Sequence, residues 1–194
     1  TAARIRHELD RILQEPLPEK TLHRLSTLGV LQQIHPALVV DTWQQEQFVT
    51  LRTKYAQAER ANPLRQGPLE QLYWGVLVLY LPPEAHQPLI ERLVLRGETQ
   101  QLMAGLRVLQ EQQSTLCSLP LPTSQLVAVL DRSTPTAIAL WIALDVAPTL
   151  TPILTRYLAE WRHMRSILDG HALRAMGLPS GPLYSKILAA LRAA

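Results

Sequence analysis

Apolar side chains recur every three or four residues along most of this chain, which is the spacing of amphipathic α-helices. Residues 3–14 place Ile5, Leu9, Ile12 and Leu13 on one stripe, and the pattern returns after each proline-rich break. No segment shows the strict alternation of a half-buried strand. The pattern therefore predicts an all-α fold, an elongated array of about ten to twelve short helices with no sheet.

Prolines and capping residues mark where these helices begin and end. Asp41 is expected to cap a helix that reaches residue 61, with Trp43 and Phe48 facing inward. Gly29 is expected to take the left-handed conformation that ends a helix. Pro88 is expected to begin a helix that Gly97 ends. The expected helices are 3–14, 19–28, 42–61, 69–81, 88–97, 98–113, 125–132, 136–145, 152–168, 171–176 and 183–194.

Composition narrows the class of protein. Apolar residues make up 47% and charged residues 18%, which excludes a disordered chain. The longest apolar run, residues 72–81, is shorter than the roughly 20 residues that cross a bilayer, so no membrane segment is expected. Cys117 is the only cysteine, which excludes an intramolecular disulfide. We expect Cys117 to be a small core residue and the protein to be cytoplasmic.

The residue patterns of common catalytic and metal sites are missing. There is no Asp-x-Asp pair of the kind that holds two metal ions, and no glycine-rich phosphate loop. No histidine is followed by aspartate, and Ser180 does not stand in a Gly-x-Ser-x-Gly motif. We therefore expect neither a catalytic residue nor a metal site in this chain.

Positive charge is concentrated towards the C-terminus. From residue 150 onward, six Lys or Arg face two acids, a net charge of +4, whereas the preceding residues carry 13 basic and 14 acidic side chains, a net charge of −1. Such a basic end favours a polyanionic partner, although an ordinary solvated surface explains it equally well.

Residues 169–182 read as a short helix, a glycine-containing turn and a second helix that begins at Pro182. Free backbone N–H groups and the helix dipole favour an anion at such a turn. Ser180 and Gly181 lie in the turn, and Lys186 follows within about one helical turn. The segment is consistent with a helix-hairpin-helix phosphate clamp, and equally with a plain tight turn.

The preceding expected helix adds more cations. Its buried arc runs from Ile153 to Leu168 and includes Met164, with Arg156 and His163 on the opposite side and Arg162 between. Arginine contacts phosphates without sequence preference. The candidate RNA-binding residues are Arg156, Arg162, His163, Arg165, Arg174, Ser180, Gly181, Lys186 and Arg192.

Two stretches resemble the bacterial tRNA nucleotidyltransferase and poly(A) polymerase family, which comprises the CCA-adding and A-adding enzymes. The first, residues 4–38, is RIRHELDRILQEPLPEKTLHRLSTLGVLQQIHPAL, with an Arg-Ile-x-x-Glu-Leu motif and a Leu-Gly-Val-Leu turn. The second, residues 168–191, is LDGHALRAMGLPSGPLYSKILAAL, with a Gly-x-x-Leu-x-x-x-Gly-Leu-x-x-Gly-Pro signature. The intervening residues resemble the family only in being helical and rich in leucine.

This resemblance implies a division into the end of the neck (1–40), a helical body (41–148) and a basic tail (149–194). Arg4 and Glu8 would hold the neck in place, and body and tail would grip tRNA. The family's catalytic head, which uses Mg²⁺, ATP and in some members CTP, would precede residue 1. The chain would thus be the tRNA-binding part of an enzyme that adds CCA or A to tRNA 3′ ends, inactive by itself and without a cofactor of its own.

Two other functions remain open from the residues. A stand-alone helical adaptor that binds a protein partner fits the irregular helices and the nearly neutral first 149 residues. A nonspecific DNA-binding module fits the basic hairpin.

Overall fold

A computed structural model describes residues 1–118, 121–164, 170–177, 181, 183–184 and 187–188. Within these residues the chain forms α-helices and short 3₁₀ helices and no strand, so the all-α prediction is confirmed. The α-helices are α1 (Ala2–Leu13), α2 (Pro18–Thr27), α3 (Val30–Ile34), α4 (Thr42–Gln57), α5 (Leu69–Leu79), α6 (Pro83–Leu93), α7 (Gly97–Cys117), α8 (Thr123–Leu130), α9 (Pro135–Ala143), α10 (Thr151–Ala159) and α11 (Gly170–Ala175). The 3₁₀ helices are η1 (Pro63–Gln66), η2 (Pro148–Leu150) and η3 (Trp161–His163).

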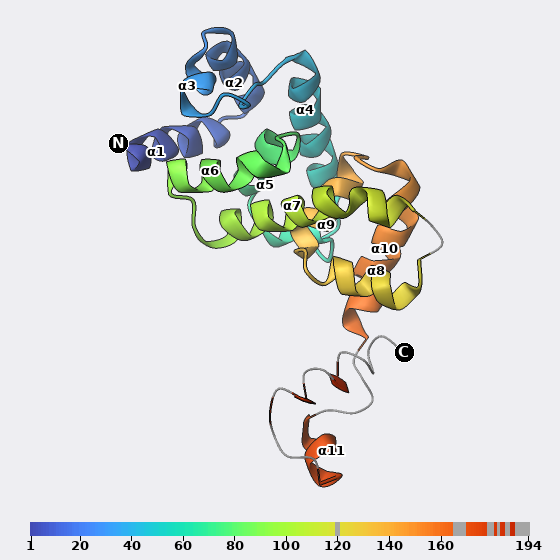
Figure 1. Cartoon of the computed structure of the whole chain (residues 1–194). Helices are drawn as coiled ribbons and strands as arrows, with labels where there is room; N and C mark the ends of the chain where they lie inside the picture. The colour runs from blue at the N-terminus through green and yellow to red at the C-terminus, as the bar shows by residue number, and fades with distance from the viewer. Residues whose placement is uncertain (119–120, 165–169, 178–180, 182, 185–186, 189–194) are drawn as a thin grey trace.

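Helix α5 forms the centre of the molecule (Figure 1). All eight residues from Leu72 to Leu79 are buried, because α1, α4, α7 and α9 pack around the helix. At Gly75 the approach is closest, since a Cβ atom there would lie 2.5 Å from Leu140 Cδ2 of α9. The ambiguous apolar run at 69–81 is therefore a helix, as predicted, and its uniform hydrophobicity reflects burial on every side.

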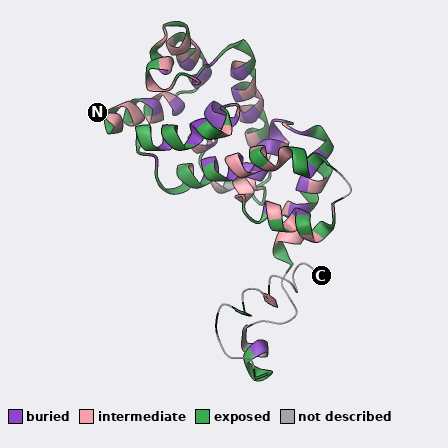
Figure 2. Ribbon diagram, viewed as in Figure 1, coloured by how far each residue is buried: buried purple, intermediate pink, exposed green. Residues whose placement is uncertain are grey.

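One continuous hydrophobic core extends from Leu9 in α1 to Tyr157 in α10. Buried side chains line the inner faces of the helices, and exposed residues cover the outside (Figure 2). Polar contacts add to this packing: Trp74 Nε1 donates a hydrogen bond to Asp10 Oδ1 over 2.9 Å and so joins α5 to α1.

Asp41 and Gly29 take their predicted capping roles, and Thr134 adds a further cap. Asp41 Oδ1 accepts a hydrogen bond from the Gln44 amide at 2.8 Å, and Thr134 Oγ1 accepts one from the Ala137 amide at 3.2 Å. Gly29 has φ +73°, the left-handed conformation expected after the second helix. Capping chemistry thus places the starts of α4 and α9.

Several predicted boundaries are wrong. Helix α4 ends at Gln57 instead of residue 61, and α7 continues to Cys117 instead of ending at residue 113.

The positions of Pro88 and Gly97 also differ from the prediction. Pro88 lies inside α6, which begins five residues earlier at Pro83. Pro88 and Glu84, whose carbonyl it cannot bond, are both exposed, while Leu89 and Ile90 remain buried. Gly97 begins α7 instead of ending the previous helix.

Two predicted side-chain positions are also wrong. Trp43 is 47% exposed in the first turn of α4, where the edge of its ring contacts Tyr80 at 4.3 Å between ring centroids. Cys117 is exposed at the last turn of α7.

No single helix within the described residues is long and apolar enough to cross a membrane. Among the helices that the structure describes, only α8 and α9 pass that test as a pair, by length and composition alone, and they are bent by 105° relative to each other.

Candidate nucleic-acid interface

Arg156, Arg162 and His163 lie at the end of the helical body, where α10 gives way to η3 (Figure 1). The expected helix over 152–168 is too long: α10 ends at Ala159, and Glu160 leaves the helical conformation with φ −121° and ψ −63°. Arg162 and His163 therefore belong to a separate turn of 3₁₀ helix. The expectation of one continuous basic helix face is corrected to a basic bend.

The buried arc of this segment is shorter than expected. Leu154 and Tyr157 are buried, and the Tyr157 hydroxyl donates a hydrogen bond to Asp131 Oδ1 at 2.7 Å. Met164 is 62% exposed, because it follows the end of η3 and no helix turns it inward. Apolar packing and this hydrogen bond thus hold α10 against the rest of the core, and the chain leaves the core after Trp161.

The charge of Arg156 is already partly compensated. Its Nε lies 3.0 Å from Glu160 Oε2, one helical turn away, and its guanidinium lies 5.4 Å from the Trp161 ring centroid. Both members of the ion pair are largely exposed, so the pair is weak. His163 is exposed and Arg162 is half-buried.

The turn after α11 has one of its expected features. Arg174 is exposed in the last turn of α11, and Gly177 has φ +83°, the left-handed conformation that ends a helix there. Gly181 is exposed. The remaining candidate residues lie outside the described residues, so the phosphate clamp stays a prediction: Arg165, Ser180, Lys186 and Arg192.

Arg4 and Glu8 are both exposed on α1. They border an apolar groove of about 390 Å³ between α1 and the α2–α3 pair, lined by side chains that include Ile5, Ile12 and Val30. Glu8 Oε2 lies 3.8 Å from Arg11 on the same helix. Their predicted role in holding the neck remains a prediction.

A buried ion pair within the predicted neck and body was not foreseen from the sequence. Glu19, 4% exposed, accepts two hydrogen bonds from the Arg52 guanidinium, at 2.9 and 3.0 Å. The Tyr73 hydroxyl accepts a third from Arg52 at 3.3 Å. The hydrogen bonds that Arg52 donates to Glu19 raise the pKa of Arg52, and burial raises the pKa of Tyr73. This cluster joins α2, α4 and α5, and its members show no motif that would reveal them.

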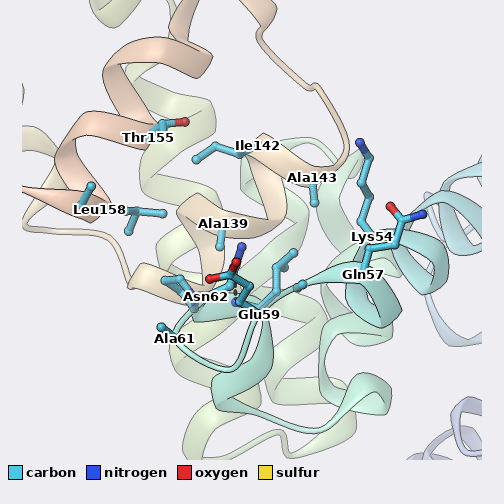
Figure 3. Close-up of a pocket in the computed structure, with 14 residues that line it drawn as sticks. Lys54, Gln57, Glu59, Ala61, Asn62, Ala139, Ile142, Ala143, Thr155 and Leu158 are labelled. Atoms are coloured by element: carbon cyan, nitrogen blue, oxygen red, sulfur yellow. Dashed lines mark hydrogen bonds between the residues drawn. The ribbon is translucent and has the colours of Figure 1, made fainter.

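A pocket of about 600 Å³ was also not predicted (Figure 3). It lies between the C-terminal end of α4 with its following loop and the helices α9 and α10. The side chains of Leu64, Ala139 and Ala143 form its buried floor. Lys54, Gln57, Glu59 and Asn62 stand at its rim. The sequence carries no signal for it, because its lining comes from three separated segments.

The described residues do not fit a catalytic metal ion. Nowhere in this part of the chain do three His, Cys, Asp or Glu side chains gather closely enough to hold one. We therefore derive no step through Mg²⁺ for this chain.

Comparison with known proteins identifies a family model and solved structures that this chain resembles. Residues 1–41 match the family model described as the probable RNA- and SrmB-binding site of polymerase A. No curated protein matches the sequence at a significant level.

Solved structures match over the full length of the chain. A CCA-adding enzyme with CTP is 19% identical with a TM-score of 0.65, and the match covers 100% of this chain and 47% of that chain. The apo form I of a CCA-adding enzyme is 19% identical with a TM-score of 0.67, covering 100% and 45%. The Thermotoga maritima CCA-adding enzyme complexed with tRNA is 18% identical with a TM-score of 0.62, covering 100% and 47%.

The resemblance drawn from the sequence motifs is confirmed in two ways. The segment with the Arg-Ile-x-x-Glu-Leu motif matches a polymerase A family model, and the whole chain has a fold found in CCA-adding enzymes. The chain spans about half the length of the solved structures that it matches.

Proposed function

We propose that this chain is the tRNA-binding C-terminal region of a template-independent tRNA nucleotidyltransferase or poly(A) polymerase. The observation that carries the proposal is the conjunction of the two matches: an RNA-binding family model over residues 1–41 and a full-length likeness to CCA-adding enzymes, one of them complexed with tRNA. The +4 charge from residue 150 onward supports it further.

In this proposal the chain binds and does not catalyse. Nucleotide addition belongs to a catalytic head that lies in the same protein outside these 194 residues. That head uses Mg²⁺ and ATP, and in a CCA-adding enzyme also CTP. The whole protein acts in the cytoplasm.

The basic bend supplies the phosphate contacts. Arg162 and His163 lie in η3, and Arg174 lies in α11. None of the ion pairs formed within the described residues involves these three side chains. Each Lys or Arg that neutralises a phosphate releases counterions, so binding weakens with salt by about one unit of log–log slope per contact.

Binding to tRNA and to an acceptor minihelix, compared over a salt series, tests the proposal. We expect tighter binding to tRNA, and we expect Arg162→Ala, Arg174→Ala and Lys186→Ala each to lower the salt slope by about one. Arg156→Ala should lower it less, because Glu160 already pairs with that side chain. Exposed Arg92 on α6, outside the matched segment 1–41 and outside the tail, provides the matched control, and Arg92→Ala should leave the slope unchanged.

Unchanged slopes in all three tail variants would remove the phosphate-contact assignment. Equal affinity for duplex DNA and tRNA would favour a general nucleic-acid module instead. If the chain binds no nucleic acid at all, the alternative function, a helical adaptor that binds a protein partner, is favoured. We also expect no nucleotide incorporation by this chain with ATP, CTP and Mg²⁺.

A further inference from the structure

The pocket between α4, α9 and α10 has walls that are fixed before any ligand arrives. Asn62 Oδ1 accepts a hydrogen bond from the Leu64 amide at 3.0 Å, which holds the loop that closes one side. Tyr55 donates a hydrogen bond to the Gly67 carbonyl at 3.1 Å, and the Arg65 guanidinium lies 4.5 Å from the Tyr55 ring centroid. A pocket held in this way binds without a large ordering cost.

Its floor and walls are aliphatic. Leu64, Ala139 and Ala143 are buried beneath it, and Ile142 and Leu158 line the sides as half-buried residues. Two of the three side chains that α9 contributes, Ala139 and Ala143, are short, and Ile142 stands beside them (Figure 3). An apolar surface of this kind accepts the face of a planar ring.

Its rim carries the polar groups that such a ring would need at its edges. Lys54 and Gln57 stand side by side at the end of α4, and Glu59 and Asn62 stand on the loop (Figure 3). Lys54 and Glu59 make no ion pair within the described part of the chain. Amide and carboxylate groups bond the edges of nucleobases, and lysine bonds phosphate.

We infer that this pocket binds a single nucleotide unit, with its base on the alanine floor and its phosphate at Lys54. The volume of about 600 Å³ falls within the range of small-molecule sites. An aliphatic side chain from a partner protein would fill the floor but make no polar contact with Lys54 or Gln57 at the rim. The nucleotide satisfies floor and rim together.

The inference deepens the proposed function and rests on it for the source of the ligand. Thr155 and Leu158 reach the pocket from α10, the helix that also carries Arg156 towards the basic bend. The pocket and the basic bend thus share α10, and an unstacked nucleotide of an RNA bound at the bend would lie next to the pocket. A free mononucleotide has the same chemistry, and the test separates the two sources.

Amide NMR of the full chain gives a readout that is specific to the pocket. We expect AMP or UMP, or a short single-stranded RNA containing both bases, to shift the amide signals of Ala139, Ala143 and Thr155. Shifts with RNA alone assign the pocket to an unstacked RNA base, and shifts with the mononucleotides assign it to a free nucleotide. Either result supports a nucleotide site.

Two variants test where the ligand sits. Thr155 is exposed at the pocket mouth, so Thr155→Trp should fill the mouth without disturbing the core and weaken binding at least tenfold. Lys54→Ala should weaken binding of AMP about fivefold and leave adenosine, which has no phosphate, unaffected. Lys20→Ala, at an exposed lysine on α2 outside the pocket, is the matched control.

Other results would overturn the inference. These are shifts of the pocket amides by isoamyl alcohol but not by nucleotides, shifts confined to other surfaces, or unchanged affinity in Thr155→Trp that retains its far-UV circular dichroism. Failure of this inference is distinguishable from failure of the proposed function. Mononucleotides can shift the pocket amides even if the salt series shows no tRNA binding. Conversely, the salt series can show tRNA binding while the pocket amides stay unshifted.

Discussion

Val94 is the residue with the most unfavourable backbone in the described chain. It ends α6 with φ +52° and ψ +44°, a left-handed conformation that β-branched residues rarely adopt. Its carbonyl accepts a hydrogen bond from Arg6 Nη1 at 2.8 Å, which joins this turn to α1. The contact with α1 and the burial of the neighbouring Leu93 and Leu95 hold the turn in place.

Replacing Val94 by glycine should therefore stabilise the protein. We expect Val94→Gly to raise the free energy of unfolding by about 1 kcal/mol, because glycine adopts this conformation without a Cβ clash. Urea denaturation measures the change. Asp145→Gly, at φ +51°, is the control and should gain less, since aspartate tolerates this region better. A destabilised Val94→Gly would mean that the valine side chain contributes more than its backbone costs.

His86 makes stability depend on pH. The ring is 1% exposed between α6 and α7, and burial lowers its pKa, as does the Arg107 charge, while Leu81, Met103 and Glu111 oppose this in part. The folded protein therefore holds the ring neutral at pH values where the unfolded chain, with the ordinary pKa of 6.5, is protonated. Stability is retained above pH 6.5 and is lost as the pH falls from there towards the folded-state pKa.

Unfolding curves between pH 7.5 and 5 check this prediction. His86→Phe keeps an aromatic ring in the core and should flatten the pH dependence in this interval. His7→Gln, at an exposed histidine on α1, should keep the slope of the parent protein. An unaltered slope in His86→Phe would move the pH dependence to another group.

At the scale of elements, the Glu19–Arg52 pair decides how α2 is placed against α4. Glu19 is 5% and Arg52 28% exposed at the side chain, so removing one partner leaves a buried charge. We expect Arg52→Ala to cost about 3 kcal/mol of unfolding free energy. Arg11→Ala, which removes an exposed partner of Glu8, should cost less than about 0.5 kcal/mol. Equal losses in both variants would place the stabilisation of α2 in its apolar face alone.

Elements also differ in how far their sequence predicts them. Helices α1, α5 and α9 follow from apolar spacing and capping residues, which are local. The end of α10 does not, because the pattern of apolar residues continues through Met164 while the helix stops at Ala159. Glu19 was unpredictable for a related reason: an acid in the first turn of a helix is usually solvated, and only the arrival of Arg52 from α4 explains its burial.

At the scale of the whole molecule, the sequence motifs predicted the fold but only part of the site. The motifs at both ends pointed to the family fold that the comparisons support. The candidate RNA-binding residues are described only in part, and the rim of the pocket, from Lys54 to Asn62, was missed because it faces α9 and α10 from far along the chain. A surface site formed by residues that are far apart in the sequence gives no periodic pattern from which it could be predicted.

The continuous core predicts cooperative unfolding. Since the same buried cluster includes Leu9 of α1 and Tyr157 of α10, no group of helices within it can separate without exposing apolar surface of the rest. We expect far-UV circular dichroism and tryptophan fluorescence to report one coincident transition in urea. Trp74 of α5 and Trp141 of α9 are buried, so their exposure on unfolding supplies the fluorescence change. Two separated transitions would show that the predicted neck and body unfold independently.

The complete enclosure of α5 has a consequence for synthesis. Two of the helices that cover it, α7 and α9, lie after it in the chain, and α9 ends only at Ala143. During translation the run from Leu72 to Leu79 is thus made before the helices that shield it, and it stays uncovered until some sixty further residues have emerged. A nascent chain of this protein accordingly exposes a fully apolar helix for several seconds at ordinary elongation rates, which makes that segment a binding site for chaperones and the region most prone to aggregation if synthesis stalls.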